Sequence, residues 1–364
     1  MKISEVISIL ENLADPSLQE NYDNAGLIIG QSNWECTGIV CTLDATEEVI
    51  YEAIEKEINL VVAHHPIIFG GLKKINAKNY VEKTVITAIK NDIAIYAIHT
   101  NLDNVIQGVN GKIASKLGLK NLSILSSKSN TLKKLFTFAP IENAAKVRDA
   151  IFNAGGGQIG NYSECSFNTE GEGTFKAGEG TDPYVGEIGQ QHHEKEIKIE
   201  VIFPAWLEKK ILSSMIHAHP YEEPAYEVVN LSNSHQAIGS GVIGSLEQPM
   251  DEISFLTHVK EIFGTPVIRH TELTGKPVKK VAVCGGAGSF LVGSAIANGA
   301  EIYITADMKY HEFFDANGRM VIADIGHYES EQFTIDLLEE ILAQKFPTFA
   351  VLKTQVETNP VRYF

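Results

Sequence analysis

Cysteine is scarce in this 364-residue chain, which contains four. None of them belongs to a C-x-x-C pair; they are Cys36, Cys41, Cys165 and Cys284. Their scarcity and spacing argue against a disulfide framework and against a zinc site built from thiolates. We therefore expect reduced cysteines with mostly structural roles.

Long hydrophobic runs and an excess of basic residues are missing as well. The longest apolar stretches, such as residues 93–98, have the length of a strand and are far too short to span a bilayer. The net charge of -16 opposes non-specific binding to nucleic acid, because that affinity comes mainly from neutralising phosphates. The N-terminus, with Glu5, is typical of an amphipathic helix rather than a signal peptide. We expect a cytoplasmic protein without a membrane partner, and nucleic acid is a disfavoured partner.

Apolar strands that alternate with helices are what the chain does contain. Strands are predicted over 38–44, 59–63 and 93–98, and again over 281–284, 301–305 and 320–324. Continuous apolar strands separated by helices are typical of a largely parallel sheet that is covered on both faces. We predict an α/β protein in which two similar halves, 1–126 and 241–364, form one core domain with mixed, largely parallel sheets.

The segment between the halves, residues 127–240, has a different character. Strands near 134–138, 197–203 and 226–231, with two helices among them, indicate β-α-β-β-α-β in outline. We predict an inserted α+β domain of the ferredoxin-like kind with its own small core. Its glycine-rich stretch 171–180 is a candidate mobile loop, and 190–196 is expected to be a charged loop.

Candidate metal ligands follow two neighbouring strands of the first half. His64 and His65 end the strand 59–63, and Asp103 comes shortly after the strand 93–98. The carboxyl ends of strands are where α/β sheets place their ligands. Taken alone, an H-H pair is more often explained by hydrogen bonds in the core, and an Asp after a strand by a helix cap or turn.

The second half repeats this pattern. His327 and Glu331 lie four residues apart after the strand 320–324, so they share one face of a helix. A solvated i,i+4 contact would be the ordinary explanation for the pair. Asp307 and His311 follow the strand 301–305 and would face the same cleft. Several strand ends thus present imidazole or carboxylate independently.

These five side chains predict a pair of metal ions. The predicted ligands are His64, His65, Asp103, His327 and Glu331. Five ligands are too many for one open catalytic zinc but fit two ions that share a carboxylate, and Glu331 is long enough to bridge. A set without thiolate suits zinc, iron or manganese. Asp44 and His99 are candidates to orient the imidazoles, and His99, Asp307 and His311 are candidates for proton transfer.

The whole chain resembles the type 2 homologues of GTP cyclohydrolase I, also called NGG-interacting-factor-three-like proteins, which have a dinuclear metal centre. The resemblance is carried by residues 21–27, 42–46, 63–66, 99–103, 285–289, 305–311 and 326–331. It implies two divalent ions per subunit on the same five residues, and a toroidal homohexamer around an internal cavity. The insertion, with residues 219–226, is similar to CutA and PII-like trimeric proteins.

Two functions follow from this resemblance and from the predicted site. The first is a metal-dependent hydrolase acting on GTP, a related nucleotide or another phosphorylated small molecule; for GTP, hydroxide would attack C8 of guanine and release formate. The glycine-rich residues 285–289 would form either a phosphate-binding nest or a tight structural turn. The alternative is a non-catalytic metal-binding protein with a regulatory or metal-handling role. Whether the protein is an enzyme is left open by the sequence.

Overall fold

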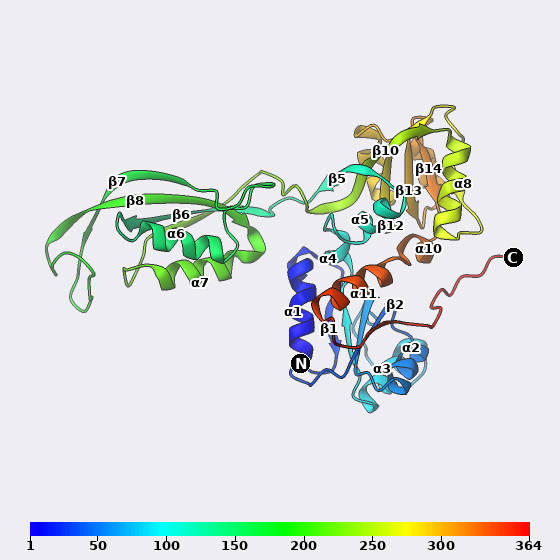
Figure 1. The fold of residues 1–364 in the computed structure, drawn as a ribbon, viewed down its shortest axis with the longest axis horizontal. Coiled ribbons are helices and arrows are strands. Elements are labelled where there is room, and N and C mark those ends of the chain that lie inside the picture. The colour runs from blue at the N-terminus through cyan, green and yellow to red at the C-terminus, as the bar shows by residue number, and fades with distance from the viewer. The chain divides into compact units, whose positions relative to one another are not determined.

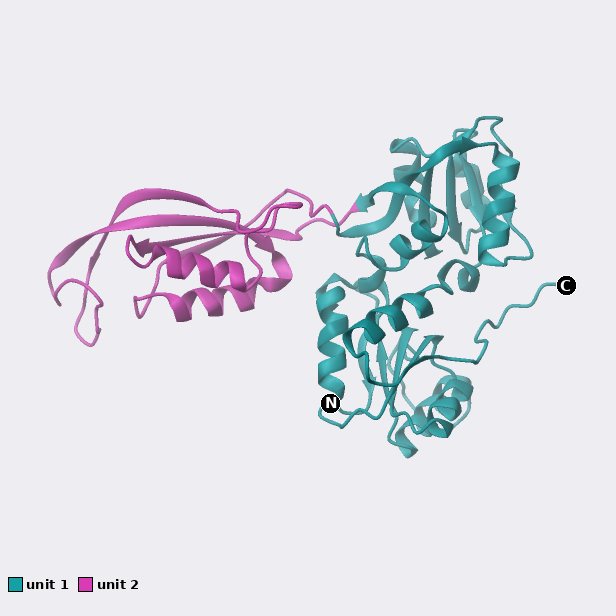
Figure 2. Cartoon of the chain, in the orientation of Figure 1, with its two compact units in different colours: residues 1–126, 237–364 teal, residues 127–236 magenta.

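The computed structural model describes residues 1–364, which form two compact units (Figure 2). The core unit comprises residues 1–126 and 237–364, and the inserted unit comprises residues 127–236. Both predicted α/β halves therefore belong to one unit, which contains two separate sheets. None of the helices combines the length and the apolar character that crossing a bilayer requires.

The first sheet of the core unit has five strands in the order β1-β4-β3-β2-β15, and only the β1–β4 pair is antiparallel (Figure 1). Its strands are β1 (Gly26–Ile29), β2 (Ile39–Asp44), β3 (Leu60–His65), β4 (Ala94–Ala97) and β15 (Val351–Lys353). The helical elements of this part are α1 (Ile3–Leu13), η1 (Pro16–Leu18), α2 (Glu47–Glu55), α3 (Tyr80–Lys90), α4 (Thr100–Asp103) and α11 (Thr334–Lys345). The helix α5 (Val109–Lys116) follows α4 in the sequence but packs against the second sheet (Figure 1). The central strands are almost wholly buried, as their continuous apolar runs predicted.

The second sheet has six strands in the order β11-β14-β13-β12-β10-β5. Its strands are β5 (Lys120–Ser127), β10 (Gly239–Met250), β11 (Arg269–His270), β12 (Val278–Ala287), β13 (Ile302–Ala306) and β14 (Val321–Asp324). The helical elements are α8 (Glu252–Phe263), η3 (Ser289–Leu291), α9 (Val292–Ala297), η4 (Tyr310–Ala316) and α10 (His327–Glu331). Strands β12, β13 and β14 run parallel, so the predicted mixed and largely parallel α/β class is confirmed.

The two halves exchange edge strands. β5 belongs to the first half of the sequence but pairs in the second sheet, and β15 comes from the end of the chain but pairs with β2 in the first sheet. The C-terminal residues after β15 consequently run along the first half. This exchange positions segments from both ends of the sequence near the same side chains.

The inserted unit has the element order β-α-β-β-α-β that the sequence predicted, with an antiparallel sheet in the order β7-β8-β6-β9. Its elements are β6 (Leu132–Pro140), α6 (Ala144–Asn153), β7 (Phe167–Lys176), β8 (Gln191–Pro204), η2 (Ala205–Leu207), α7 (Glu208–Ala218) and β9 (Tyr226–Asn230). Apolar side chains of β6, β8 and both α-helices form its core.

Two loop predictions in this unit were wrong. Residues 171–176 belong to β7, and His192 and His193 lie within β8 rather than in a charged loop. Glycine is depleted in strands, and this stretch is largely exposed, so neither composition nor alternation indicated a strand. Pairing with β8 along all ten residues of β7 holds it extended.

Candidate metal centre

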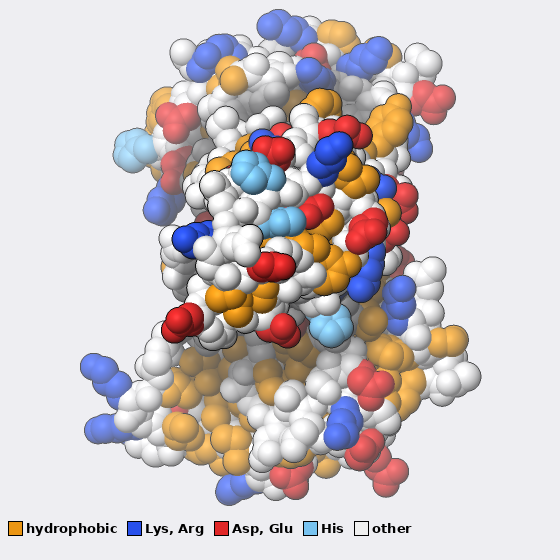
Figure 3. Space-filling view, turned by 90° about the vertical axis from the view of Figure 1, so that its left-hand side faces the viewer, with side chains coloured by type: hydrophobic (Ala, Val, Ile, Leu, Met, Phe, Trp, Pro, Cys, Tyr) orange, Lys and Arg blue, Asp and Glu red, His pale blue; other side chains and the backbone are white.

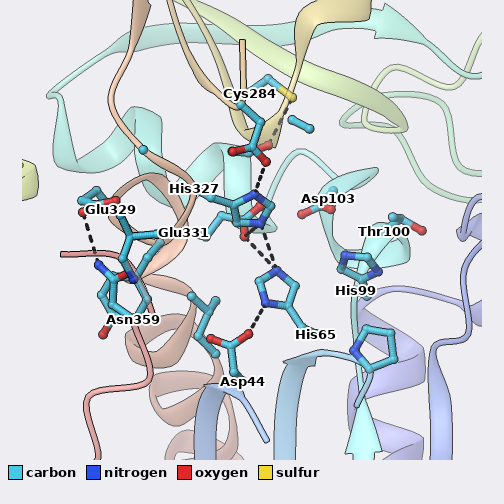
Figure 4. Close-up of a pocket in the computed structure, with 18 of the residues that line it drawn as sticks. Asp44, His65, His99, Thr100, Asp103, Cys284, His327, Glu329, Glu331 and Asn359 are labelled. Atoms are coloured by element: carbon cyan, nitrogen blue, oxygen red, sulfur yellow. Dashed lines mark hydrogen bonds and ion pairs between the residues drawn. The ribbon is translucent and has the colours of Figure 1, made fainter. Parts of the chain in front are cut away.

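A cavity of about 910 Å³ in the core unit is lined by side chains from both α/β halves. It lies where β2, β3, β13 and β14 end, at the carboxyl edges of the parallel strands. Figure 4 shows its imidazole and carboxylate side chains converging from these elements. From the sequence, we expect the candidate ligands to lie at these carboxyl ends of the strands.

His64 and His65 are the last two residues of β3, and each ring is held by its Nδ1 atom. His64 Nδ1 lies 2.8 Å from the backbone carbonyl oxygen of Ile98, and His65 Nδ1 lies 2.8 Å from Asp44 Oδ1. These two bonds fix the orientation of both rings, so that the Nε2 atoms of His64 and His65 face Glu331.

Residues after β4 bring a second pair of side chains to the cavity. Asp103 ends α4, and its Oδ1 lies 3.6 Å from His64 Nε2. His99, just before α4, faces Asp23 Oδ1 at 2.8 Å through its Nδ1 atom. Asp23 also accepts hydrogen bonds from the backbone and the hydroxyl of Thr100. Asp23 thus fixes both the His99 ring and the start of α4.

His327 and Glu331 lie on α10, one turn apart. His327 Nδ1 lies 2.7 Å from Asp307 Oδ2, and His327 Nε2 lies 3.1 Å from Glu331 Oε2. Gly326, at φ +94°, precedes the helix, and a Cβ atom there would lie 2.2 Å from Glu329 Oε2. Only glycine therefore lets the chain turn from β14 into α10 at this point.

Glu331 joins the two sets of side chains. Its Oε1 lies 3.9 Å from His64 Nε2, and its Oε2 lies 3.0 Å from His65 Nε2. Two groups of three donor atoms result, each with all atoms within 4.8 Å of one another: His64, Asp103 and Glu331, and His65, His327 and Glu331. A third such group, His64, His65 and His99, makes His99 a further candidate ligand.

Charges at the centre are strongly perturbed. Burial alone would lower the pKa of His65, but hydrogen bonds to Asp44 and Glu331 raise it to about 9. Burial would also lower the pKa of His327, but hydrogen bonds to Asp307 and Glu331 raise it to about 11. Burial raises the pKa of Asp103, and nearby Glu331 raises it further. The pKa of Glu331 is lowered despite its burial, because His327 and His65 bond to it.

The buried ring nitrogens fit a metal ion. His64 is fully buried, burial lowers its pKa to about 3, and its Nε2 atom has no hydrogen-bond partner. An unpartnered buried acceptor of this kind is costly unless something binds it. His65 Nε2 and His327 Nε2 lie 3.3 Å apart, and both also face Glu331. Imidazole nitrogens that converge on a shared carboxylate form a donor set suited to divalent cations.

Of the three candidates for proton transfer, two line the cavity and the third, His311, does not. His99 and Asp307 line the cavity, and Asp307 holds the His327 ring. The structure does not bring His311 into this cluster: it is exposed on η4, and its ring contacts Tyr310 and Phe314. Although it follows β13 in the sequence, His311 belongs to none of the three groups of donor atoms.

Sequence reasoning missed several contributors to the cavity. Asp23 was not singled out, although it lies in the stretch 21–27 that carries the family resemblance. Thr358 donates a hydrogen bond to Asp44 Oδ2 at 2.9 Å, and the neighbouring Asn359 contacts Glu329 Oε1 at 3.3 Å. No local signal marks these C-terminal residues, because Thr358 and Asp44 lie 314 positions apart in the sequence.

The glycine-rich residues 285–289 allow close approach to the centre. The amide of Gly285 donates to Asn110 Oδ1, and that of Gly286 donates to Ser330 Oγ. A Cβ atom on Gly286, at φ +59°, would lie 2.5 Å from Glu331 Oε1. These two amides already have partners within the protein, and the close approach of Gly286 to Glu331 supports the alternative of a tight structural turn.

Fold and site together define an α/β protein whose clustered imidazoles and carboxylates could hold metal ions. Residues 1–360 match the model of the Duf34/NIF3 (NGG1p interacting factor 3) family. The chain belongs to this family.

Known relatives match along essentially their full lengths. A Halalkalibacterium halodurans protein named GTP cyclohydrolase 1 type 2 homolog is 38% identical, with 100% of both chains covered. A Bacillus subtilis protein of the same name is 35% identical, over 99% of this chain and 98% of its own. The crystal structure of a Bacillus cereus protein related to NIF3 superposes with a TM-score of 0.88 at 38% identity, covering 100% of this chain and 99% of its own.

Proposed function

We propose that the cavity of the core unit binds two divalent metal ions, one at His64, Asp103 and Glu331 and the other at His65, His327 and Glu331. The observation that carries this proposal is the position of the Glu331 carboxylate, whose two oxygens face different sets of nitrogen donors. Zinc, iron and manganese are the candidates, because the donors are nitrogen and oxygen only.

We propose further that the protein is a metal-dependent hydrolase. Bound ions of this kind supply hydroxide at neutral pH and polarise the group under attack. Around them, Asp44, Asp307 and the Ile98 carbonyl hold the imidazoles in orientation. His99 is held by the contact between its Nδ1 atom and Asp23, and its ring centroid lies 5.3 Å from those of His64 and His65, so it is our candidate for the proton acceptor.

The names of the relatives and the lining of the cavity support GTP or a related nucleotide as the substrate class that we propose. Relatives named as GTP cyclohydrolase homologues support GTP or a related nucleotide. Aromatic side chains that line the cavity could stack on a purine; they are Tyr22, Phe69, Tyr80, Phe290, Tyr328 and Tyr363. Arg269 is the only Lys or Arg in the lining, and its guanidinium already pairs with Asp324. Phosphate groups would therefore depend on the metal ions for charge compensation.

Metal content tests the first part of the proposal. We expect purified wild type reconstituted with zinc or manganese to hold two ions per chain by elemental analysis. Glu331→Gln should lose both, because both sites share this carboxylate, and Asp103→Asn should weaken one. Glu247→Gln, an exposed position on β10, is the matched control. Wild-type content in Glu331→Gln would contradict the assignment.

Activity tests the second part. We expect metal-loaded protein incubated with GTP to release formate and a pterin triphosphate, and Glu331→Gln to release neither. Absence of metal-dependent turnover on GTP and on a panel of nucleotides and phosphoesters would reject the hydrolase. It would leave the non-catalytic alternative, a metal-binding regulatory or metal-handling protein, provided that the metal content is as expected.

We propose, finally, that the chain assembles into the toroidal homohexamer that the family resemblance implies. Three exposed aromatic side chains on η3 and η4 support an interface: Phe290, Tyr310 and Phe314 are 67%, 73% and 66% exposed, and Phe290 also lines the cavity. A hydrogen bond from Ser289 to Glu312 joins the two short helices that carry them. Exposed aromatic clusters of this kind are typical of protein interfaces.

A further inference from the structure

The inserted unit contains a second cavity, of about 700 Å³, that plays no part in the metal centre. Strands β7 and β8, the connection 177–190 and the turn 221–225 surround it. Figure 3 looks onto the end of the inserted unit that carries the β7–β8 hairpin, where acidic and hydrophobic side chains lie next to one another.

Aromatic rings form part of its wall. The ring centroid of Tyr221 lies 6.1 Å from that of Phe175 on β7. It lies 6.2 Å from the ring centroid of Tyr184, which belongs to the connection. Phe138 adds a fourth ring to the lining. Two hydrogen bonds hold the connection beside the cavity. The Tyr184 hydroxyl donates to Glu142 at 3.3 Å, and the backbone amide of Asp182 donates to Glu222 at 3.1 Å.

Glu196 is the buried carboxyl side chain in the lining of this cavity. Its side chain lines the cavity although the residue is only 8% exposed, and its Oε1 accepts a hydrogen bond of 2.8 Å from the Tyr221 hydroxyl. No Lys, Arg or His forms an ion pair with it. Gly173 on β7 leaves room for this carboxylate, because a Cβ atom there would lie 2.2 Å from Oε2. A buried carboxylate without a cation is costly.

The remaining lining is acidic as well. Its carboxylates are Glu170, Glu172, Glu196, Glu200, Glu222 and Glu223, and its cations are Lys176 and Lys198. Lys198 already pairs with Glu200 at 3.1 Å. These carboxylates do not converge as the side chains of the metal centre do, where three donor atoms lie within 4.8 Å of one another. The cavity therefore favours a cation but lacks the compact donor set that a metal ion requires.

We propose that this cavity binds a small organic cation, an alkylammonium or guanidinium compound. The cationic group would pair with Glu196 and lie against the faces of Tyr221 and Phe175, an arrangement that combines a salt bridge with a cation–π contact. The apolar body of the ligand would lie against Phe138 and Tyr184. Binding at this place would link the inserted unit to the level of a cationic metabolite.

Calorimetric titration of the full-length protein with agmatine and with spermidine tests the proposal. We expect saturable binding of at least one of them, one ligand per chain. Glu196→Gln keeps the shape and removes the charge, and should weaken binding by about tenfold or more. Glu227→Gln, an exposed position on the neighbouring strand β9, removes the same charge outside the cavity and should bind as wild type does.

Several results would overturn the proposal. The proposal would be wrong if neither cation bound at millimolar concentration. It would also be wrong if Glu196→Gln and Glu227→Gln weakened binding equally, because that would indicate general attraction of cations to an acidic protein. Phe175→Ala is the second variant, because its side chain belongs to the hairpin wall and lies outside the core of the inserted unit. Unchanged binding in Phe175→Ala together with unchanged binding in Glu196→Gln would place any bound cation elsewhere.

Discussion

Asp44 connects the end of the chain to the candidate metal centre. One of its oxygens faces His65 Nδ1, and the other accepts the Thr358 hydroxyl. The pKa of Asp44 is lowered although burial opposes this, because His65 and Thr358 bond to the ionised form. Groups that orient a ligand imidazole influence metal affinity without touching the ion. Thr358 therefore acts on the centre through Asp44.

Replacing Thr358 with valine tests this link. Thr358→Val keeps the shape but removes the hydrogen bond to Asp44, so we expect the affinity at the His65 site to fall by about tenfold. Competition with a chromophoric chelator measures it. Thr257→Val, which removes an exposed hydroxyl on α8, should change nothing. Equal affinities of wild type and Thr358→Val would show that the C-terminal residues do not position His65.

At the scale of elements, the C-terminal segment is held by Glu52 of α2. Its carboxylate accepts hydrogen bonds from the Thr354 hydroxyl, from the amide of Gln355 at 2.9 Å and from Lys56 at 2.6 Å. Burial raises the pKa of Glu52, but these bonds outweigh it and leave the pKa below its ordinary value of 4.5. The segment that lines the metal cavity is thus anchored by an ionised side chain.

This anchor predicts a pH-dependent stability. Because the pKa of Glu52 is lowered by folding, its contribution is present above about pH 4.5 and is lost as the pH falls through the lowered value. We expect Glu52→Gln to lower the free energy of unfolding by about 1–2 kcal/mol at pH 7, and by less near pH 3. Urea unfolding at both pH values measures this.

Glu55→Gln, on the exposed face of the same helix, is the control for that experiment and should unfold like wild type. The free energy of unfolding could instead fall by the same amount in Glu52→Gln at pH 7 and at pH 3. That result would mean that the ionised carboxylate is not what holds the segment.

At the scale of the whole molecule, the exposed aromatic side chains Phe290, Tyr310 and Phe314 predict assembly. We expect light scattering after size exclusion to give the mass of six chains for wild type. Phe290→Ser combined with Phe314→Ser should reduce the assembled mass, because these side chains would lose their apolar interface area. Ile253→Ser, at an exposed apolar position on α8, is the control. A wild-type monomer at micromolar concentration would reject the hexamer.

Much of the fold could be predicted from the sequence because its signals are local. Continuous apolar runs identified β2, β3 and β13, and polar caps such as Thr46 and Asn79 begin the helices that follow strands. Strand β7 escaped prediction because its composition is glycine-rich and its face is exposed. What holds that strand is its pairing partner, which no local pattern encodes.

The sequence by itself determined which chemistry the site can have. His64 and His65 end β3, Asp103 follows β4 at the end of α4, and His327 and Glu331 share one face of α10. Residue type and spacing alone indicate nitrogen and oxygen donors. Tertiary structure alone decided how these donors are shared. Glu331 faces imidazoles that come from both halves of the chain, and Thr358 reaches Asp44 across 314 positions of sequence after β15 has paired with β2. Contacts between residues hundreds of positions apart depend on sheet order, and sheet order is set by packing of the whole unit.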